Sequence, residues 1–166
     1  MVIKRIISGG QTGADQGGLY AAWTMDIETG GTATKGYRTQ DGPNLRLKTQ
    51  FGLVEHPSPK YPPRTSENVR NADATIRFAA DFSSSGEECT MRAIKRFKKP
   101  YFDIDIHDPV PPYITVGWLL TNKVEVLNVA GNSESRAPGI FVFTKAYLMS
   151  VLRMIQASED GLIPLD

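Results

Sequence analysis

The chain has 166 residues, a formal net charge of +1, 40% hydrophobic residues and 22% charged residues. These values are typical of one globular domain with a buried core, so we expect a single domain over residues 1–166. The near-zero charge predicts no bulk attraction to nucleic acid or to a membrane surface. No apolar stretch is expected to span a bilayer, and the first residues lack the layout of a signal peptide. A single cysteine, Cys89, excludes an internal disulfide. We therefore expect a cytoplasmic protein.

Strand and helix signals alternate along the chain. Apolar or alternating patterns predict strands at residues 2–7, 27–29, 74–79, 101–106 and 124–129. Helical spacing and capping residues predict helices after residue 13, at 65–71, from 84 to 99, from 111 to about 121, and from 138 onward. This alternation indicates an α/β fold in which a mainly parallel sheet of about five strands is covered on both faces. The long polar segment at 32–63 is expected to contain little regular structure apart from an extended stretch at 51–55.

The helical spacing also predicts which side chains face the core. The first helix is expected to bury Leu19, Ala22 and Trp23, and the helix after residue 111 is expected to bury Ile114, Trp118 and Thr121. The last helix presents Tyr147, Leu148, Val151, Leu152 and Ile155 on one face. Cys89 is expected to be buried on its own helix.

A glycine-rich turn follows the first predicted strand and precedes a helix. Gly9, Gly10 and Gly13 permit positive φ and close approach of the backbone, and Gln11 and Thr12 add uncharged hydrogen-bonding side chains. Such a turn points backbone N–H groups and a helix N-terminus at open space, an arrangement that favours an anion, most often a phosphate. The glycine spacing is not that of the dinucleotide fingerprint, and no Walker lysine follows. The sequence therefore predicts a binding site here more strongly than it predicts a reaction.

Charged side chains near this turn extend the candidate site. Asp15 lies in the first turn of the helix, where it either complements the helix dipole or accepts hydrogen bonds from a ligand. After the second strand, Lys35 and Arg38 are framed by glycines and can neutralise a bound phosphate, while Asp41 can orient Arg38 or contact the ligand. Arg64 begins a polar helix that can face the same crevice. A solvated surface loop and a capped surface helix are the alternative interpretations of these segments.

A second glycine turn opens the helix that begins near residue 84. Ser85, Gly86 and Thr90 can line the crevice together with the first turn. Glu87 and Glu88 can act as a general acid or base, or bind sugar hydroxyls. Both glutamates also lie three residues after a serine, which is the spacing of a capping box and requires no function.

A third turn of this type follows the strand at 124–129 and contains Gly131 and a candidate helix cap, Ser135. Because the carboxyl ends of parallel strands meet at one edge of a sheet, all three turns are expected to converge on one crevice.

The acidic segment at 103–108 is an improbable metal site, since the chain has only two histidines and no paired cysteines. We therefore assign no metal ligands.

Taken together, these segments resemble the putative molybdenum carrier family. The resemblance covers nearly the whole chain and depends on four blocks: Ile7 to Asp15; Gly30-Gly31 with Lys35-Gly36, Arg38 and Asp41-Gly42; Arg64-Thr65 with Asn68-Val69 and Asp73; and Asn128 to Gly131 with Glu134-Ser135 and Pro138-Gly139. The family is part of a Rossmann-like superfamily that includes lysine-decarboxylase-like proteins and cytokinin-activating phosphoribohydrolases. The resemblance implies a Rossmann-like three-layer sandwich that forms homo-oligomers.

The same resemblance implies a carrier or sensor that binds a phosphorylated pterin, such as molybdenum cofactor (molybdopterin), or a nucleotide-like ligand. Molybdopterin holds its metal through dithiolene sulfurs, so such a protein needs no metal ligands of its own. The alternative is a small hydrolase of nucleoside monophosphates, like the phosphoribohydrolases, with Glu87 or Glu88 as the acid or base. The phosphoribohydrolases carry a Gly-Gly-x-Gly-Thr-x-x-Glu run, which the segment Ser85-Gly86-Glu87-Glu88 does not reproduce.

Overall fold

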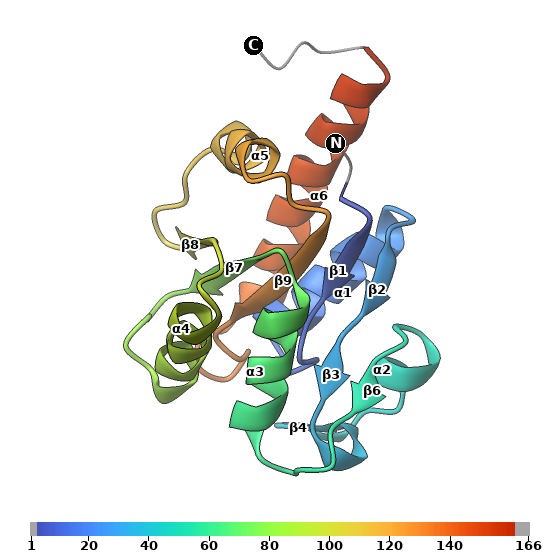
Figure 1. The fold of residues 1–166 in the computed structure, drawn as a ribbon, viewed down its shortest axis with the longest axis vertical. Coiled ribbons are helices and arrows are strands. Elements are labelled where there is room, and N and C mark those ends of the chain that lie inside the picture. The colour runs from blue at the N-terminus through green and yellow to red at the C-terminus, as the bar shows by residue number, and fades with distance from the viewer. Residues whose placement is uncertain (1–2, 162–166) are drawn as a thin grey trace.

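The computed structural model describes residues 3–161 and contains a main sheet of five strands (Figure 1). The strands are β1 (Arg5–Ile7), β2 (Glu28–Gly30), β7 (Ala74–Ala79), β8 (Tyr101–Asp105) and β9 (Val126–Gly131). Their order across the sheet is β2-β1-β9-β7-β8, and every neighbouring pair is parallel. The predicted parallel α/β sheet is therefore confirmed. Val2, which the sequence assigns to the first strand, lies outside the described residues.

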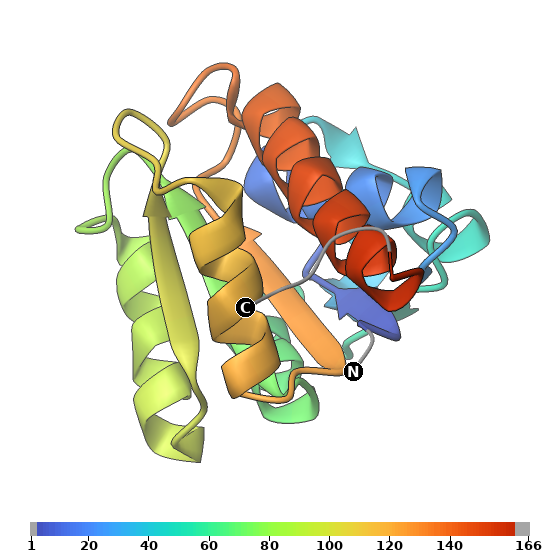
Figure 2. The same ribbon diagram turned by 90° about the horizontal axis from the view of Figure 1, so that it is seen from above.

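Helices cover both faces of this sheet (Figure 2). They are α1 (Ala14–Thr24), α3 (Tyr61–Asn71), α4 (Ser85–Phe97), α5 (Pro112–Thr121) and α6 (Ile140–Glu159). Helices α1, α5 and α6 pack together on one face, and α3 and α4 pack together on the other. Since β9 returns to lie between β1 and β7, the strand order reverses at the centre of the sheet. Open α/β sheets bind ligands beyond the carboxyl ends of the strands at such a point.

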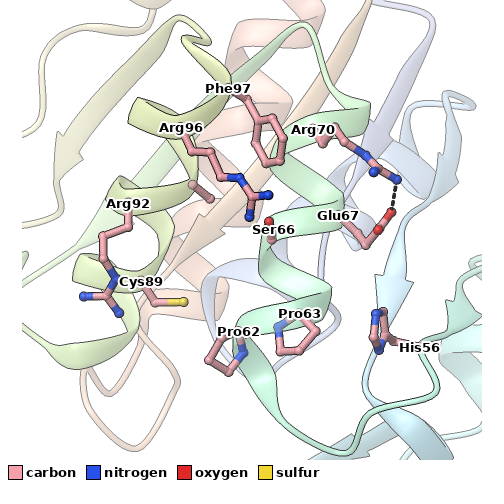
Figure 3. A pocket seen from close by; sticks show the side chains of 11 residues that line it. His56, Pro62, Pro63, Ser66, Glu67, Arg70, Cys89, Arg92, Arg96 and Phe97 are labelled. Carbon is pink, nitrogen blue, oxygen red and sulfur yellow. Dashed lines mark hydrogen bonds and ion pairs between the residues drawn. The ribbon is translucent and has the colours of Figure 1, made fainter.

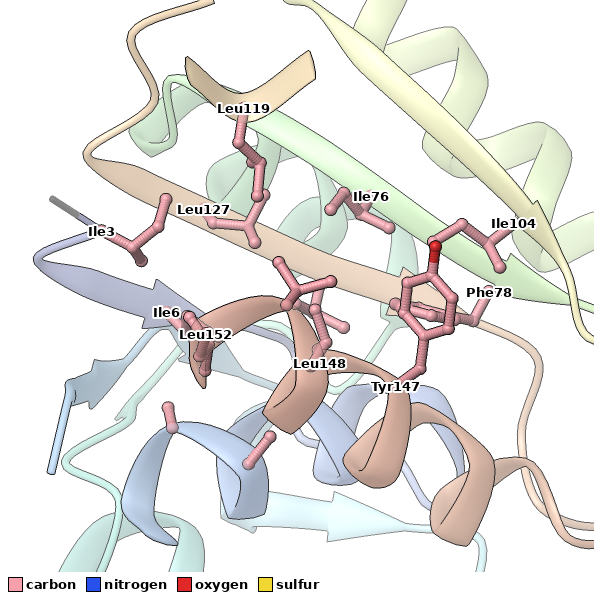
Figure 4. Close-up of a cluster of buried hydrophobic side chains, with 14 of the residues drawn as sticks. Ile3, Ile6, Ile76, Phe78, Ile104, Leu119, Leu127, Tyr147, Leu148 and Leu152 are labelled. Atoms are coloured by element: carbon pink, nitrogen blue, oxygen red, sulfur yellow. The ribbon is translucent and has the colours of Figure 1, made fainter. Parts of the chain in front are cut away.

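The main core lies between the sheet and α6 (Figure 4). Ile6, Ile76 and Leu127 project from three neighbouring strands and are fully buried. They meet Leu148 and Leu152, which lie four residues apart on α6 and therefore on one face of the helix. All six residues of β7 are buried, as expected for a central parallel strand that is covered on both faces.

Helix α6 has 20 residues and is long and apolar enough, by length and composition alone, to cross a membrane. The sequence-based expectation that no segment meets this criterion was wrong. The predicted core face is confirmed, however, because Tyr147, Leu148, Val151, Leu152 and Ile155 are all buried in the main core. This packing is that of a core helix in a globular fold.

Two helices differ in part from the predicted faces: in α1, Leu19 and Ala22 are buried as predicted, but Trp23 is not. Trp23 is 51% exposed, because α1 packs against α6 and the sheet through its small residues Gly17, Gly18, Ala21 and Ala22. Helix α5 buries Thr115, Val116 and Leu119, whereas Ile114 is 42% exposed and Thr121 lies at the surface. This helix is apolar on nearly every side, so its sequence periodicity could not identify the buried face.

The segment between β2 and α3 is more regular than expected. It contains β3 (Thr32–Ala33), a 3-10 turn (Lys35–Tyr37), β4 (Arg38–Thr39), β5 (Gly42–Pro43), α2 (Arg46–Thr49) and β6 (Val54–Glu55). These short elements enclose a second cluster of buried side chains, which consists of Leu19, Ala33, Tyr37, Leu47, Phe51 and Leu53. The cluster fixes the segment beside β1 and α1.

Several element ends differ from the predicted ones. Helix α3 begins at Tyr61, four residues before the predicted cap Thr65. Its first turn contains two prolines, which are tolerated there because the N–H groups of the first helical residues have no partner within the helix. Strand β9 begins at Val126 instead of residue 124. Helix α6 begins at Ile140, and Pro138 lies in the turn before it.

Candidate functional site

A cavity of about 390 Å³ opens at the carboxyl ends of β1, β7 and β9. We call it the central cavity. Its lining comes from the turn after β1, the first turns of α3 and α4, and the turn after β9. Of the residues predicted from the sequence, it brings together Gln11, Asp15, Arg64, Ser85, Gly86, Glu87, Thr90 and Gly131. Three separate strand-to-helix turns thus do converge on one crevice.

Asn132 holds these turns together. Its Oδ1 accepts the N–H groups of Ala80 and Asp81, and its Nδ2 donates to the carbonyl of Asp81 and to Glu87 Oε2. Its backbone N–H donates to the Phe78 carbonyl, and its carbonyl accepts the N–H of Ala14. One buried amide therefore fixes the ends of β7 and β9 and the start of α1 relative to one another.

The turn after β1 differs from its prediction, because three of its N–H groups, those of Gly10, Gln11 and Thr12, already have acceptors within the protein. Gly10 N–H donates to Ser8 Oγ at 3.2 Å, Gln11 N–H to Asp15 Oδ2 at 3.1 Å and Thr12 N–H to Gln11 Oε1 at 2.9 Å. The glycines serve close packing instead. Gly13 (φ +88°) lies against the backbone of residues 132–134, so only a glycine fits there. Gly10 lies beneath two leucines of the second cluster, away from the central cavity.

Arg64 covers Gly9 and is the principal cation of the central cavity. A methyl group at Gly9 would overlap the Arg64 guanidinium, so the glycine creates the space in which this side chain lies. Arg64 Nη1 is 3.6 Å from Asp15 Oδ2, and the Arg64 side chain is 11% exposed. Its Nε atom is buried and has no hydrogen-bond partner among residues 3–161. A buried guanidinium with an unused donor is well suited to an anionic group.

Asp15 faces this guanidinium from the first turn of α1 and is almost fully buried. Burial raises the pKa of Asp15 from 3.8 to about 6. Arg64 and the hydrogen bond from Gln11 N–H oppose this rise, and the nearby carboxylate of Glu87 adds to it. With a pKa of about 6, Asp15 is still mostly ionised at neutral pH, so its carboxylate offsets part of the positive charge of Arg64 at this end of the cavity.

The start of α4 is the open helix N-terminus of the central cavity. Ser84 Oγ accepts the N–H of Glu87, which confirms Ser84 as the predicted helix cap. The reciprocal half of a capping box differs, because Glu87 Oε2 accepts from Ser84 Oγ instead of from the Ser84 N–H. The N–H groups of Ser85 and Gly86, the first two residues of α4, donate to no acceptor among residues 3–161. Two free N–H groups at the positive end of a helix of 13 residues thus line the cavity.

The two glutamates of this turn have different surroundings. Glu87 is buried and lines the central cavity, whereas Glu88 is exposed and lies outside that lining. Burial raises the pKa of Glu87, although hydrogen bonds from Ser84 and Asn132 and the positive charge of Arg77 oppose the rise. Because both hydrogen bonds go to Oε2, only Oε1 of Glu87 is available to a ligand.

Arg77 supports this turn from beneath. It is buried in β7, donates from Nη1 to the Glu87 carbonyl, and forms a bidentate pair with Asp103 at 2.7 and 2.6 Å. Asp103 is one of the acidic residues near the end of β8, and this pairing gives it a structural role.

The segment containing β4 and β5 contributes different residues from those predicted. The structure places Lys35, Arg38 and Asp41 at exposed positions outside the lining of the central cavity. Gln40 lines it instead, and Gln11 Oε1 accepts the N–H of Gln40. Gly9, Thr12 and Gly13 also lie outside the lining, behind Arg64 and the turn after β9.

Sequence reasoning did not identify Tyr61 and Arg136 as candidate residues. Tyr61 is 42% exposed at the edge of the cavity, and its ring centroid lies 5.3 Å from the Arg64 guanidinium carbon. Arg136 reaches the cavity from the turn after β9. An aromatic residue immediately before two prolines was the available signal for Tyr61, since it marks a helix start at the sheet edge. Arg136 has no signal beyond its place in a strand-to-helix turn.

Comparison with known proteins identifies the family and the fold of this chain. Residues 6–152 match the model of the circularly permuted YpsA SLOG family. A solved structure of a putative molybdenum carrier protein from Syntrophus aciditrophicus superposes with a TM-score of 0.82 at 30% sequence identity, covering 91% of this chain and 95% of that chain. No curated protein sequence matches significantly. The resemblance expected from the sequence and the Rossmann-like fold are both confirmed.

Proposed function

Because the chain belongs to the circularly permuted YpsA SLOG family, we propose that it is a carrier or sensor that binds a phosphorylated pterin such as molybdenum cofactor, or a nucleotide-like compound, in the central cavity. The observation that carries the proposal is the pairing of a buried, partly unpartnered guanidinium, Arg64, with the free N–H groups of Ser85 and Gly86. Both donors line one cavity and both suit phosphate oxygens.

The remaining lining suits a heterocyclic group attached to that phosphate. Tyr61 offers an exposed aromatic face at the cavity edge, and Gln11, Gln40 and Ser133 offer uncharged hydrogen-bonding groups. A volume of about 390 Å³ lies within the range of small-molecule sites. The neighbour in Syntrophus aciditrophicus that is described as a putative molybdenum carrier supports a pterin cargo.

Molybdenum cofactor fits this lining as cargo held by its organic part. Its phosphate would lie against Arg64 and the start of α4, and its pterin would lie near Tyr61. Its metal is held by its own dithiolene sulfurs, so the protein has only to bind and shield the ligand.

The proposal is tested by measuring the mass of the protein as it is purified, together with any ligand that remains bound. Native mass spectrometry of protein purified from its own source should show an added mass of one phosphorylated heterocycle per chain. Titration calorimetry with guanosine monophosphate and with pyrophosphate tests the phosphate site directly, since guanine and pterin share the 2-amino-4-oxopyrimidine ring. Native protein without added mass that also fails to bind either compound would contradict the proposal.

Hydrolysis of a nucleoside monophosphate is the second candidate, and one observation favours it. Glu87 lines the cavity with a raised pKa and one free carboxylate oxygen, as a general acid requires. The exposed position of Glu88 leaves Glu87 as the residue to test. Incubation with a panel of nucleoside monophosphates, followed by chromatography for free base, separates the two functions. Turnover that Glu87→Gln abolishes supports the hydrolase; tight binding without turnover supports the carrier.

A further inference from the structure

A second cavity of about 500 Å³ lies between α3 and α4 (Figure 3). We call it the α3–α4 groove. Pro62, Cys89 and Arg92 line both this groove and the central cavity, so the two spaces adjoin at these three residues. A ligand that is longer than the central cavity can therefore extend from it directly into the groove.

The groove carries positive charge that the protein does not neutralise. Arg70 is paired with Glu67 at 2.7 Å. Arg92 and Arg96 form no ion pair and no hydrogen bond within the described part of the chain, residues 3–161. They lie four residues apart on α4, where two like charges on one face destabilise a helix slightly. Figure 3 shows the two side chains diverging, with Arg96 reaching toward α3 and Arg92 pointing the other way past Cys89.

The position of Arg96 is set by its neighbours. Its guanidinium carbon lies 5.2 Å from the ring centroid of Phe97, and Figure 3 shows the side chain reaching from α4 across the groove toward Ser66 of α3. Beneath this rim the groove has an apolar floor, where Ala93 is buried and Phe97 is half-buried. Cations above an apolar floor suit a ligand segment that carries both a phosphate and a flat or hydrocarbon group.

We infer that the ligand of the central cavity continues past Pro62, Cys89 and Arg92 into the α3–α4 groove, where Arg96 binds a second anionic group. The ligand class is a compound of dinucleotide size with two separate anionic groups. This inference rests on the proposed function, because it takes the first anionic group to be bound by Arg64 and the start of α4.

The test compares guanosine monophosphate with the dinucleotide pGpG, which carries a second phosphate and a second base. In titration calorimetry, the wild-type protein is expected to bind pGpG at least about tenfold more tightly than guanosine monophosphate. Arg96→Gln is expected to remove this advantage while leaving the affinity for guanosine monophosphate unchanged. Lys95→Gln is the matched control: it removes the same charge from the adjacent residue of α4, which does not line the groove.

Cys89 provides a second readout because it lies between the two cavities and is the single cysteine of the chain. Bound pGpG should slow the reaction of Cys89 with a thiol reagent far more than bound guanosine monophosphate does. This difference should persist in Lys95→Gln and disappear in Arg96→Gln.

The possible failures are distinguishable. If guanosine monophosphate binds but pGpG binds no more tightly, or if Arg96→Gln and Lys95→Gln reduce pGpG affinity equally, the groove is not a subsite and the proposed function stands. If neither nucleotide nor pyrophosphate binds to the wild-type protein and the purified protein carries no added mass, the proposed function fails and the inference fails with it.

Discussion

Two of the three strand-to-helix turns that border the central cavity differ in how they use their N–H groups. The turn from β1 to α1 contains three glycines within five residues, yet Gly10, Gln11 and Thr12 donate their N–H groups to the protein itself. The turn from β7 to α4 contains one glycine and leaves the N–H groups of Ser85 and Gly86 free. A high glycine content therefore indicates close packing here, whereas an open helix N-terminus indicates a possible binding site.

The difference arises from what lies opposite each turn. The turn after β1 faces Asp15 and Arg64, which occupy the space that a ligand could have taken. The turn after β7 faces the cavity itself, and its serine cap satisfies only the N–H of Glu87. The first turn thus positions the cation, and the second supplies the free donors.

The largest expected effect comes from removing that cation. Arg64→Gln should weaken binding of guanosine monophosphate and pyrophosphate about 100-fold, because it removes a charge-assisted, partly buried donor. Titration calorimetry measures the change, and circular dichroism confirms folding. Arg38→Gln is the control, since Arg38 is exposed and outside the cavity lining. Equal losses in both variants would show that Arg64 contributes no more than an exposed arginine outside the cavity, which contradicts its assignment as the phosphate-binding cation.

The second prediction concerns the acid that faces Arg64. The pKa of Asp15 is raised to about 6 in the folded protein from 3.8. Between pH 3.8 and about 6, Asp15 therefore keeps its proton in the folded protein but loses it in the unfolded chain. The contribution of Asp15 to the free energy of unfolding is fully present below about pH 4 and is lost as the pH rises through 6. Asp15 lies 3.6 Å from Arg64, but the cost of burying its charge outweighs this attraction, so ionisation of Asp15 makes the folded protein less stable.

Asp15→Asn should remove this dependence. Relative to wild type, the variant should gain about 2 kcal/mol in the free energy of unfolding between pH 4 and pH 7, measured by urea denaturation. The asparagine can still accept the N–H of Gln11, so the turn after β1 is retained. Parallel pH profiles for the two proteins would mean that Asp15 ionises normally and that its carboxylate is fully paired with Arg64.

The third prediction removes one free N–H from the other turn. Ser85→Pro deletes the first N–H of α4 at a helix position that accepts proline, and Ser84 (φ −63°, ψ 155°) already has the conformation that a following proline requires. We expect about tenfold weaker binding of pyrophosphate with little change in thermal stability. Ser85→Ala, which keeps the N–H and removes the hydroxyl, is the matched control. Unchanged pyrophosphate affinity in Ser85→Pro would exclude this helix N-terminus from the site.

The sequence predicted the parts of this site that depend on local patterns. The strand-to-helix alternation placed the turns at one sheet edge, and the spacing of Ser84 and Glu87 predicted the serine cap on the Glu87 N–H that the structure contains. It could not predict which N–H groups remain free, because the acceptors come from the helix that follows and from distant turns. Asn132, for example, receives the N–H of Ala14 from 118 positions away in the chain only after the sheet has formed.

The position of the cation illustrates the same limit. Arg64 was a candidate, but the predicted helix start at Thr65 would have placed it before the helix. Since α3 begins at Tyr61, Arg64 lies inside the first turn and its side chain reaches Gly9. Basic residues framed by glycines, such as Lys35, gave a stronger local signal, although they lie at the surface.

The smallest expected effect therefore belongs to Lys35. The structure places it outside both the central cavity and the α3–α4 groove, so Lys35→Ala should change the affinity for guanosine monophosphate less than about twofold at physiological salt, where exposed distant charges are screened. Calorimetry at low and physiological salt provides the measurement. A larger loss that persists at physiological salt would mean that the segment after β2 closes over the ligand, and the contrast between the two strand-to-helix turns would then describe only the ligand-free protein.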